Sequence, residues 1–353
     1  MANLWQQYQE NKANKQGMYF PREAAADLGV SEGELMADAP KTVYLGGKSN
    51  VRGIVLKLHT LGQIQSIVRN SLCVHEKQGL YENVSISESS GIAVNPGGID
   101  LRIFASRWHH VLAVESVGEH GKVSRSIQFY DEFGTALQKV FLIEENKDAE
   151  WHAFIEAFKT ADKPVFQKGE LPEVSMPRLA EGHEKAFQER WNELKDVHHF
   201  NGILETFGID RQESYRHAPP GGAKQVGVEV WQAALEAVRD KGMEIMIFSG
   251  NRGIVQIQTG KVHNVVRARG YLNVLDGKEE GFSMHLKDDE IVESWIVRRP
   301  TRDGFITCIE GFDSRRKTVI QLFGKRKEGE TEQAVWREIT DALWQGPSET
   351  DSN

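Results

Sequence analysis

The chain has 353 residues, more than a single domain usually contains, which predicts two domains of about 150–180 residues each. Its 39% hydrophobic content is sufficient for buried cores, and its net charge of −8 argues against a protein that coats nucleic acid or an anionic membrane. The sequence has no long apolar run, no secretory signal and only two cysteines, Cys73 and Cys308. We therefore expect a reduced cytoplasmic protein without membrane insertion.

The predicted elements follow the same order in both halves of the chain, with helices first, strands in the middle and one helix at the end. In the first half, strands are predicted at residues 53–59, 91–94, 100–104 and 110–114, and a helix at 149–159. In the second half, helices are predicted at 184–196 and from there to 207, strands at 244–248, 253–258, 282–286, 291–297, 305–310 and 318–323, and a helix at 333–344. Many strands joined by short turns favour an antiparallel sheet. The fold class is therefore α+β.

An internal repeat explains this symmetry. Residues 19–40 align without a gap with residues 198–219, so that Gly29 lies opposite Gly208. The match continues with small insertions as far as Trp151 and Trp336. A period of about 180 residues indicates two tandem domains rather than a solenoid. We predict an N-terminal repeat at 1–160, a proline-containing linker at 161–183 and a C-terminal repeat at 184–346, each repeat a large antiparallel β-sheet with helices at its start and end.

The two copies differ most usefully at His198 and His199, which lie opposite Tyr19 and Phe20. A duplication supplies the same scaffold twice, so a residue type found in only one copy is a candidate for chemistry. Pro21 marks this position as a helix start, and Asp196 either ends the preceding helix or caps the next one.

The doublet does not favour a bare metal site. Adjacent residues on a helix point about 100° apart, and no carboxylate stands at zinc-site spacing to the doublet, so both imidazoles cannot readily bind one ion. A single imidazole at the edge of an apolar pocket is instead a common ligand of haem iron. The alternative interpretation is a helix cap or a surface group.

Five motifs carry a family resemblance: Lys195–Phe200; Val68–Asn70 with Val74–Glu76; Ile99–Arg102 with Trp108; Val297–Pro300; and Gln321–Arg326. In combination they resemble the cytoplasmic hemin-degrading and haem-transport factors of Gram-negative bacteria (HemS/ChuS-like). The resemblance covers nearly the whole chain and includes the duplication. It implies two stacked halves with haem in a cleft of the C-terminal half.

The resemblance also implies roles for particular residues. His198 would be the proximal ligand of the iron of haem b, with His199 as an alternative ligand. Arg102 would project over the distal face as the catalytic residue, and Phe104 would line that face. Arg102 stands among apolar residues of a predicted strand, where an arginine needs a partner.

Further residues would hold the edge of the haem. By the resemblance, the propionates or the rim are held by Arg211, Arg299, Gln321 and Arg326. Where the family often has lysine, Arg299 keeps the cation and adds bidentate reach to a carboxylate. Phe323 lacks the hydroxyl of a family tyrosine. His75 is a weaker candidate for a second haem site, with a surface or turn position as the alternative.

The expected function is that of a haem-binding protein of bacterial haem uptake that degrades haem oxidatively and releases its iron. Haem b would be ligand or substrate, and the partners would be an external electron donor and a haem permease or downstream haem enzyme, with the chain acting as monomer or dimer. A non-catalytic haem carrier is the first alternative, because it needs the same residues.

A DNA-binding regulator is the second alternative. Residues 24–35 resemble a helix-turn-helix, but the recognition helix at 31–38 carries acidic residues and no lysine or arginine. Such a helix would repel phosphates, so DNA binding is disfavoured.

Overall fold

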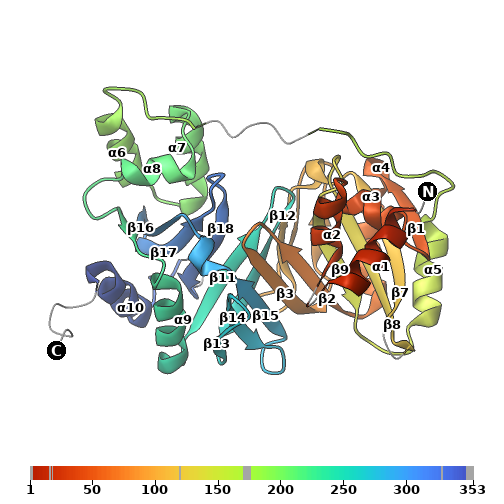
Figure 1. Ribbon diagram of the computed structural model, residues 1–353. Helices are drawn as coiled ribbons and strands as arrows, with labels where there is room; N and C mark the ends of the chain where they lie inside the picture. The colour runs from red at the N-terminus through yellow and green to blue at the C-terminus, as the bar shows by residue number, and fades with distance from the viewer. Residues whose placement is uncertain are drawn as a thin grey trace. The chain divides into compact units, whose positions relative to one another are not determined.

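The computed structural model describes residues 3–15, 17, 19–118, 121–169, 176–326 and 329–346 (Figure 1). The chain divides into two compact units, one formed by residues 1–69, 76–171 and 250–256, the other by 70–75, 172–249 and 257–353. Each unit thus takes one short segment from the opposite half of the sequence. Residues 170–175 of the predicted linker at 161–183 lie outside the described residues.

The first unit combines five helices with two groups of strands in the described chain. The helices are α1 (Leu4–Asn14), α2 (Pro21–Leu28), α3 (Glu32–Ala37), α4 (Lys48–Lys57) and α5 (Asp148–Phe158). The larger group has the order β1 (Thr42–Gly47), β7 (His110–Val117), β8 (Val123–Tyr130), β9 (Ala136–Leu142), β2 (Gln63–Arg69) and β3 (Cys73–Leu80). The smaller group is β4 (Val84–Ile86), β5 (Gly91–Ala93) and β6 (Asp100–Ile103), paired antiparallel.

The second unit repeats this plan. Its helices are α6 (Glu184–Asn192), α7 (Phe200–Phe207), α8 (Arg211–Arg216), α9 (Val230–Lys241) and α10 (Ala334–Gln345), with a 3₁₀ turn η4 at Val197–His199. The larger strand group has the order β10 (Ala223–Val226), β16 (Glu293–Thr301), β17 (Gly304–Phe312), β18 (Thr318–Gly324), β11 (Glu244–Gly250) and β12 (Ile254–Lys261). The smaller group is β13 (Val265–Ala268), β14 (Tyr271–Asp276) and β15 (Phe282–Leu286).

The predicted α+β duplication is confirmed. The helices α2 and α7 begin at residues 21 and 200, the same position in the repeat, and both end at a glycine. Gly29 and Gly208 have φ of 67° and 63°, a left-handed conformation that glycine adopts without steric cost and that ends helices. The helices α3 and α8 also begin at equivalent residues, 32 and 211, and each has a side-chain cap.

The strand predicted at 53–59 is wrong, because these residues lie in α4 and in the 3₁₀ turn Leu58–Leu61 that follows it. The β-branched residues suggested a strand, but Val51, Ile54, Val55 and Leu58 recur at helical spacing and are all buried. Packing of this helical stripe in the core of the unit outweighs the weak local preference. A helix therefore follows the first strand of each copy, since α9 has the equivalent place after β10.

The larger strand group of the second unit has two differently covered faces (Figure 1). One face packs against α9 and α10 through Ile296, Ile309 and Ile320. The other face packs against α6, α7 and α8 through Trp295, Val297, Cys308 and Phe312. Because neighbours along a strand alternate between faces, Arg299, Glu310 and Gln321 belong to the α6–α8 face.

None of the helices in the described parts of the chain is both long enough and apolar enough to cross a bilayer.

Candidate functional site

The segment before α7 is organised by Asp196. Its backbone is extended, with φ −148° and ψ 125°, and its side-chain Oδ1 accepts a hydrogen bond from the backbone N–H of His198 at 2.9 Å. Aspartate is a preferred N-cap because it satisfies a free N–H at a helix start. The helix predicted over 184–196 accordingly ends at Asn192, and Asp196 begins the next helical turn.

The imidazole of His198 is exposed to solvent. Its side chain is 86% exposed, and its Nδ1 lies 2.7 Å from Oδ1 of Asp196. The hydrogen bond from the His198 backbone, followed by that from the ring, holds the pKa of Asp196 below its usual value despite some burial. Within the described chain no group bonds Nε2 of His198, which makes this nitrogen available to a ligand. His199 is also exposed.

Phe200, the next residue, connects this turn to two arginines. Its buried ring lies 5.0 Å from the guanidinium carbon of Arg299 and 5.7 Å from that of Arg211. An aromatic face attracts cations at these distances. The residue that directly follows the histidines therefore contacts two positive charges, which come from β16 and α8.

A buried carboxylate fixes one of these arginines. Glu310 is fully buried, accepts hydrogen bonds from the Tyr215 hydroxyl and, at 2.8 Å, from the Thr318 hydroxyl, and lies 3.6 Å from Nε of Arg211. Burial, together with the nearby Glu310, raises the pKa of Tyr215 far above its ordinary value, so the hydroxyl remains a donor. The side chain of Arg211 is 25% exposed, and its guanidinium also donates a hydrogen bond to Asn201 at 3.2 Å.

Arg299 is a buried cation with no ion pair in the described chain. Only 4% of the residue is exposed, its Nη2 lies 3.1 Å from Sγ of Cys308, and its buried Nε has no hydrogen-bond partner in the described chain. Burial raises the pKa of Cys308 to about 11, against the opposing influence of Arg299, so the thiol stays neutral. A buried cation with an unused donor fits an anionic ligand such as a carboxylate.

Gln321 lies on the same face beside an aromatic strip. It opposes Glu310 on one neighbouring strand and Phe248 on the other, is half-buried, and its side chain has no hydrogen-bond partner among the described residues. Phe323, two residues along, packs edge-on against Phe248 with ring centroids 5.1 Å apart. Arg326 follows the end of β18 and donates to the carbonyl of Glu330 at 3.5 Å. A half-exposed apolar strip with a free amide fits the plane and edge of a flat aromatic ligand.

The second unit thus brings together His198, Arg211, Arg299 and Gln321 on the α6–α8 side of one sheet. The residues predicted in the first unit have their own surroundings. Arg102 lies on β6 opposite Ile92, has 41% of its side chain exposed, and donates to Asp100 Oδ1 at 2.6 Å. Asp100 is therefore the partner that the sequence required. Phe104 directly follows this strand and is 44% exposed.

His75 is not a surface or turn residue. It lies within β3, is fully buried, places Nε2 3.3 Å from the carbonyl oxygen of Ile247, and packs against Phe282 with ring centroids 4.8 Å apart. In this conformation the ring is not accessible to a ligand of the size of haem.

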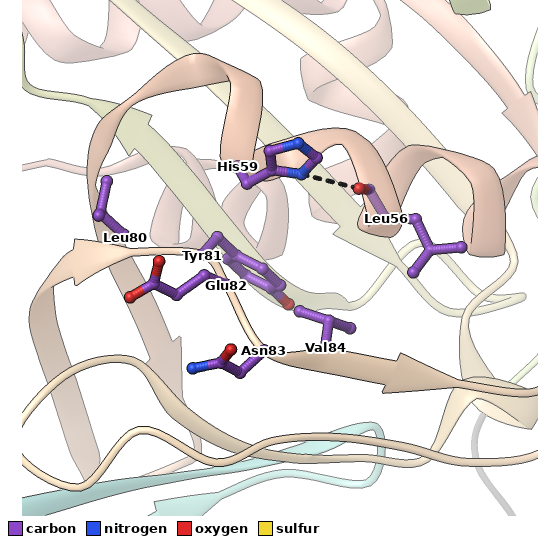
Figure 2. Close-up of a pocket in the computed structure, with 7 residues that line it drawn as sticks. All are labelled: Leu56, His59, Leu80, Tyr81, Glu82, Asn83 and Val84. Atoms are coloured by element: carbon purple, nitrogen blue, oxygen red, sulfur yellow. Dashed lines mark hydrogen bonds between the residues drawn. The ribbon is translucent and has the colours of Figure 1, made fainter.

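A pocket of about 300 Å³ lies elsewhere in the first unit (Figure 2). Figure 2 shows His59 and Leu56 on one side, Glu82 and Asn83 on the other, and Tyr81 between them. The ring of His59 bonds the carbonyl of Leu56 at 2.9 Å. This volume is at the lower end of the range for ligand pockets, and the lining contains none of the predicted site residues.

The sequence alone did not reveal the network of Glu310, Tyr215 and Thr318. A signal exists, because Glu310 aligns with Gln128 of the first copy and stands in an otherwise apolar strand. A charged residue in a buried strand indicates a hydrogen-bonding or ion-pair partner, but the sequence does not identify that partner.

Comparison with known proteins gives a consistent result. The model of the haemin-degrading HemS.ChuX domain matches residues 29–158 and again 208–343. The hemin transport protein HemS of Yersinia enterocolitica is 35% identical over 338 residues, covering 95% of this chain and 96% of that protein. Holo-PhuS, a heme-binding protein from Pseudomonas aeruginosa, is 35% identical with a TM-score of 0.88 and covers 96% of this chain and 98% of its own. The heme degrading enzyme ChuS of Escherichia coli O157:H7 is 30% identical with a TM-score of 0.86, with the same coverage.

Proposed function

The chain belongs to the haemin-degrading HemS/ChuX family, and we propose that it binds haem and degrades it oxidatively to release iron. Its two matches to the family domain account for the duplication, and its relatives include proteins described as haem-binding and haem-degrading. The observation that carries the proposal is an exposed imidazole, His198, two residues before Phe200, whose ring lies against a buried arginine, Arg299, that has no ion pair in the described chain.

In this proposal the second unit supplies the haem-binding groups. Nε2 of His198 binds the iron, because it is exposed, lacks a partner within the described chain and belongs to a ring that Asp196 contacts at Nδ1. Arg211 and Arg299 hold the propionates, as guanidinium groups bind carboxylates with charge-assisted hydrogen bonds. Gln321 donates a hydrogen bond from its amide to the edge of the haem, and the rings of Phe248 and Phe323 contact the apolar plane of the haem.

The remaining assignments rest on the family resemblance. We propose that Arg102 is the catalytic residue on the distal side of the haem and that Phe104 lines this side. His199 is an alternative ligand, and Arg326 a further rim cation. His75 would form a second site only after a local opening, because its ring is buried.

Haem itself supplies the iron at which oxygen chemistry takes place when an external donor provides electrons. The protein residues bind and orient it: His198 fixes the iron from one side, and the arginines fix the carboxylate edge. The hydrogen bond to Asp100 holds the guanidinium of Arg102 in place on its strand. We propose a cytoplasmic location, receipt of haem from a permease or delivery to a downstream haem enzyme, and action as monomer or dimer.

A turnover experiment tests the proposal. Purified protein loaded with haem is given a reductant in the presence of catalase, which removes free peroxide that would attack haem without the enzyme. We expect the Soret band to disappear and a tetrapyrrole product to form, with one iron released per haem. Haem without protein, and loaded protein without reductant, are the controls.

A haem carrier is the second candidate, because the Yersinia relative is described as a hemin transport protein. A carrier binds haem through the same residues and leaves it chemically unchanged. Recovery of intact, extractable haem after incubation with reductant would decide for the carrier.

A further inference from the structure

Asp196 makes two separate contacts with the residue proposed as the iron ligand. Its Oδ1 accepts the backbone N–H of His198 at 2.9 Å and lies 2.7 Å from the ring nitrogen Nδ1 of the same residue. The first contact caps the helical turn, and any side-chain oxygen at this position would serve. The second contact reaches the imidazole, and capping does not require it.

The second contact determines which ring nitrogen is free. An ionised carboxylate only accepts hydrogen bonds, so the nitrogen that faces it must carry the hydrogen. A neutral imidazole with its hydrogen on Nδ1 has its lone pair on Nε2. In His198, Nε2 has no hydrogen-bond partner among the described residues, and the side chain that carries it is exposed. Asp196 therefore presents the imidazole in the form that can bind a metal through Nε2.

The neighbouring histidine, His199, lacks a comparable contact among the residues that the structure describes. The ring of His199 has no hydrogen-bond or ion-pair partner within the described chain. Other histidines contact carboxylates at longer distances: 3.2 Å for His217, 3.3 Å for His263 and 3.9 Å for His109. The contact of His198 with Asp196 is the shortest of this kind among the described residues.

The first copy of the repeat has neither the histidine nor the aspartate at these positions. In the register that aligns Tyr19 with His198, Gly17 stands at the position of Asp196. The backbone of the two copies also differs here, since His199 is helical whereas its equivalent, Phe20, is extended and precedes α2. The carboxylate occurs in the copy that has the imidazole.

We propose that Asp196 is a positioning residue for haem binding, which fixes the ring form and direction of His198 and so selects it over His199 as the iron ligand. The inference rests on the proposed function, because it concerns the same site. Histidines that bind metals usually donate their other ring N–H to a carboxylate or carbonyl, and loss of that partner typically lowers metal affinity about 10- to 100-fold.

Two substitutions separate capping from positioning. Asp196→Ser keeps an oxygen that caps the turn but is too short to reach the ring, whereas Asp196→Ala removes both contacts. Thermal unfolding is measured first, and we expect Asp196→Ser to unfold at the wild-type temperature. A change in haem binding in this variant then reports on the ring contact and not on helix stability.

The first readout needs no haem. In protein with ¹⁵N-labelled imidazoles, long-range ¹H–¹⁵N spectra, recorded where the rings are neutral, show which nitrogen carries the hydrogen. We expect Nδ1–H for His198 in the wild type and a shift of the hydrogen to Nε2 in Asp196→Ser. The signals of histidines remote from residue 196 should not change, which provides an internal control.

The second readout is haem binding by the same variants. We expect about a tenfold loss of affinity in Asp196→Ser, and a lower iron–imidazole stretching frequency in resonance Raman spectra of the ferrous complex, because the donated N–H strengthens the ligand. Asp196→Ser with unchanged ring form and unchanged affinity would show that Asp196 is only a cap, and the proposal would be wrong. If His198→Ala binds haem as tightly as the wild type, the proposed ligand itself is wrong. This outcome is distinct from failure of the Asp196 proposal, because the effect of Asp196→Ser on the ring form of His198 is measured without haem.

Discussion

The same helix start occurs twice in this protein, and its surroundings differ. In the first copy Tyr19 is 5% exposed, donates its hydroxyl to Asp27 at 2.8 Å, and packs against Tyr8 with ring centroids 5.9 Å apart. In the second copy the side chain of His198 is 86% exposed and, among the described residues, forms a hydrogen bond only with Asp196. The repeat therefore uses one position for packing in one unit and leaves it open to a ligand in the other.

The sheets beneath the two helix starts differ in charge. Lys139 and Gln321 are equivalent, since Lys139 opposes Gln128 as Gln321 opposes Glu310. In the first copy Lys139 forms an ion pair with Glu32, whose equivalent in the second copy is Arg211. At these positions the first copy has one cation paired with one carboxylate. The second copy has two arginines, Arg211 and Arg299, and one carboxylate, Glu310. In the second unit Arg299, which has no ion pair in the described chain, suits an anionic ligand.

The largest effect is expected from His198→Ala. Loss of the iron ligand should shift the Soret band and weaken haem binding by about 100-fold, which corresponds to roughly 3 kcal/mol. Titration with haem and the absorption spectrum measure both. Tyr19→Phe, at the equivalent position, is the control and should leave the spectrum unchanged. An unaltered spectrum in His198→Ala and in its double variant with His199→Ala would remove the proposed ligand.

A large effect on stability is expected from Glu32→Gln in the first copy. Glu32 and Lys139 have side chains only 9% and 17% exposed, so loss of the carboxylate should cost about 2 kcal/mol in the free energy of unfolding, measured with urea. Haem affinity should not change. Equal stability of the variant and the wild type would show that this pair does not hold the first copy together.

The same pair has a defined pH dependence. Burial favours a higher pKa for Glu32, but attraction and hydrogen bonding by Lys139, with help from Arg69, hold its pKa below the usual value. A carboxyl group whose pKa is lower in the folded protein stabilises it fully above its unfolded pKa of about 4.3 and loses this effect as the pH falls through the folded pKa. The stability difference between wild type and Glu32→Gln should therefore shrink below about pH 4.

A transplant of the first-copy charges should reduce haem binding by about tenfold, or 1.4 kcal/mol. The combined variant Arg211→Glu, Glu310→Gln and Gln321→Lys installs the set of Glu32, Gln128 and Lys139 in the second copy. It removes Arg211, one of the two arginines proposed to hold the propionates, while keeping the net charge of the three positions and a paired arrangement, so we expect a folded protein. Circular dichroism checks the fold, and haem titration the affinity. Wild-type affinity would indicate that the propionates bind elsewhere.

The smallest effect is expected from Tyr19→Phe itself. It removes one hydrogen bond, to Asp27, and should cost about 1 kcal/mol in the free energy of unfolding. A much larger loss would mean that the first copy depends on this hydroxyl more than a single partly exposed hydrogen bond allows.

Much of the fold could be predicted because its signals are local. Pro21, Gly29 and Gly208 mark helix ends through backbone preferences that do not depend on the rest of the chain, and the helix boundaries follow them. The alternation of apolar residues located nine strands of the described chain, three in the first copy and six in the second. The histidine doublet was visible because the repeat supplied its own comparison.

The sequence by itself determined the duplication, its register and the residue types that distinguish the second copy. Only the tertiary structure decided that residues 53–59 are helical, that segments 70–75 and 250–256 join the opposite units, and that Glu310 lies buried under Tyr215 and Thr318. It also decided that Asp196 contacts the ring of His198. The physical reason is that turns and caps depend on neighbouring residues in the chain, whereas burial and the partner of a buried charge depend on residues that folding brings from far away.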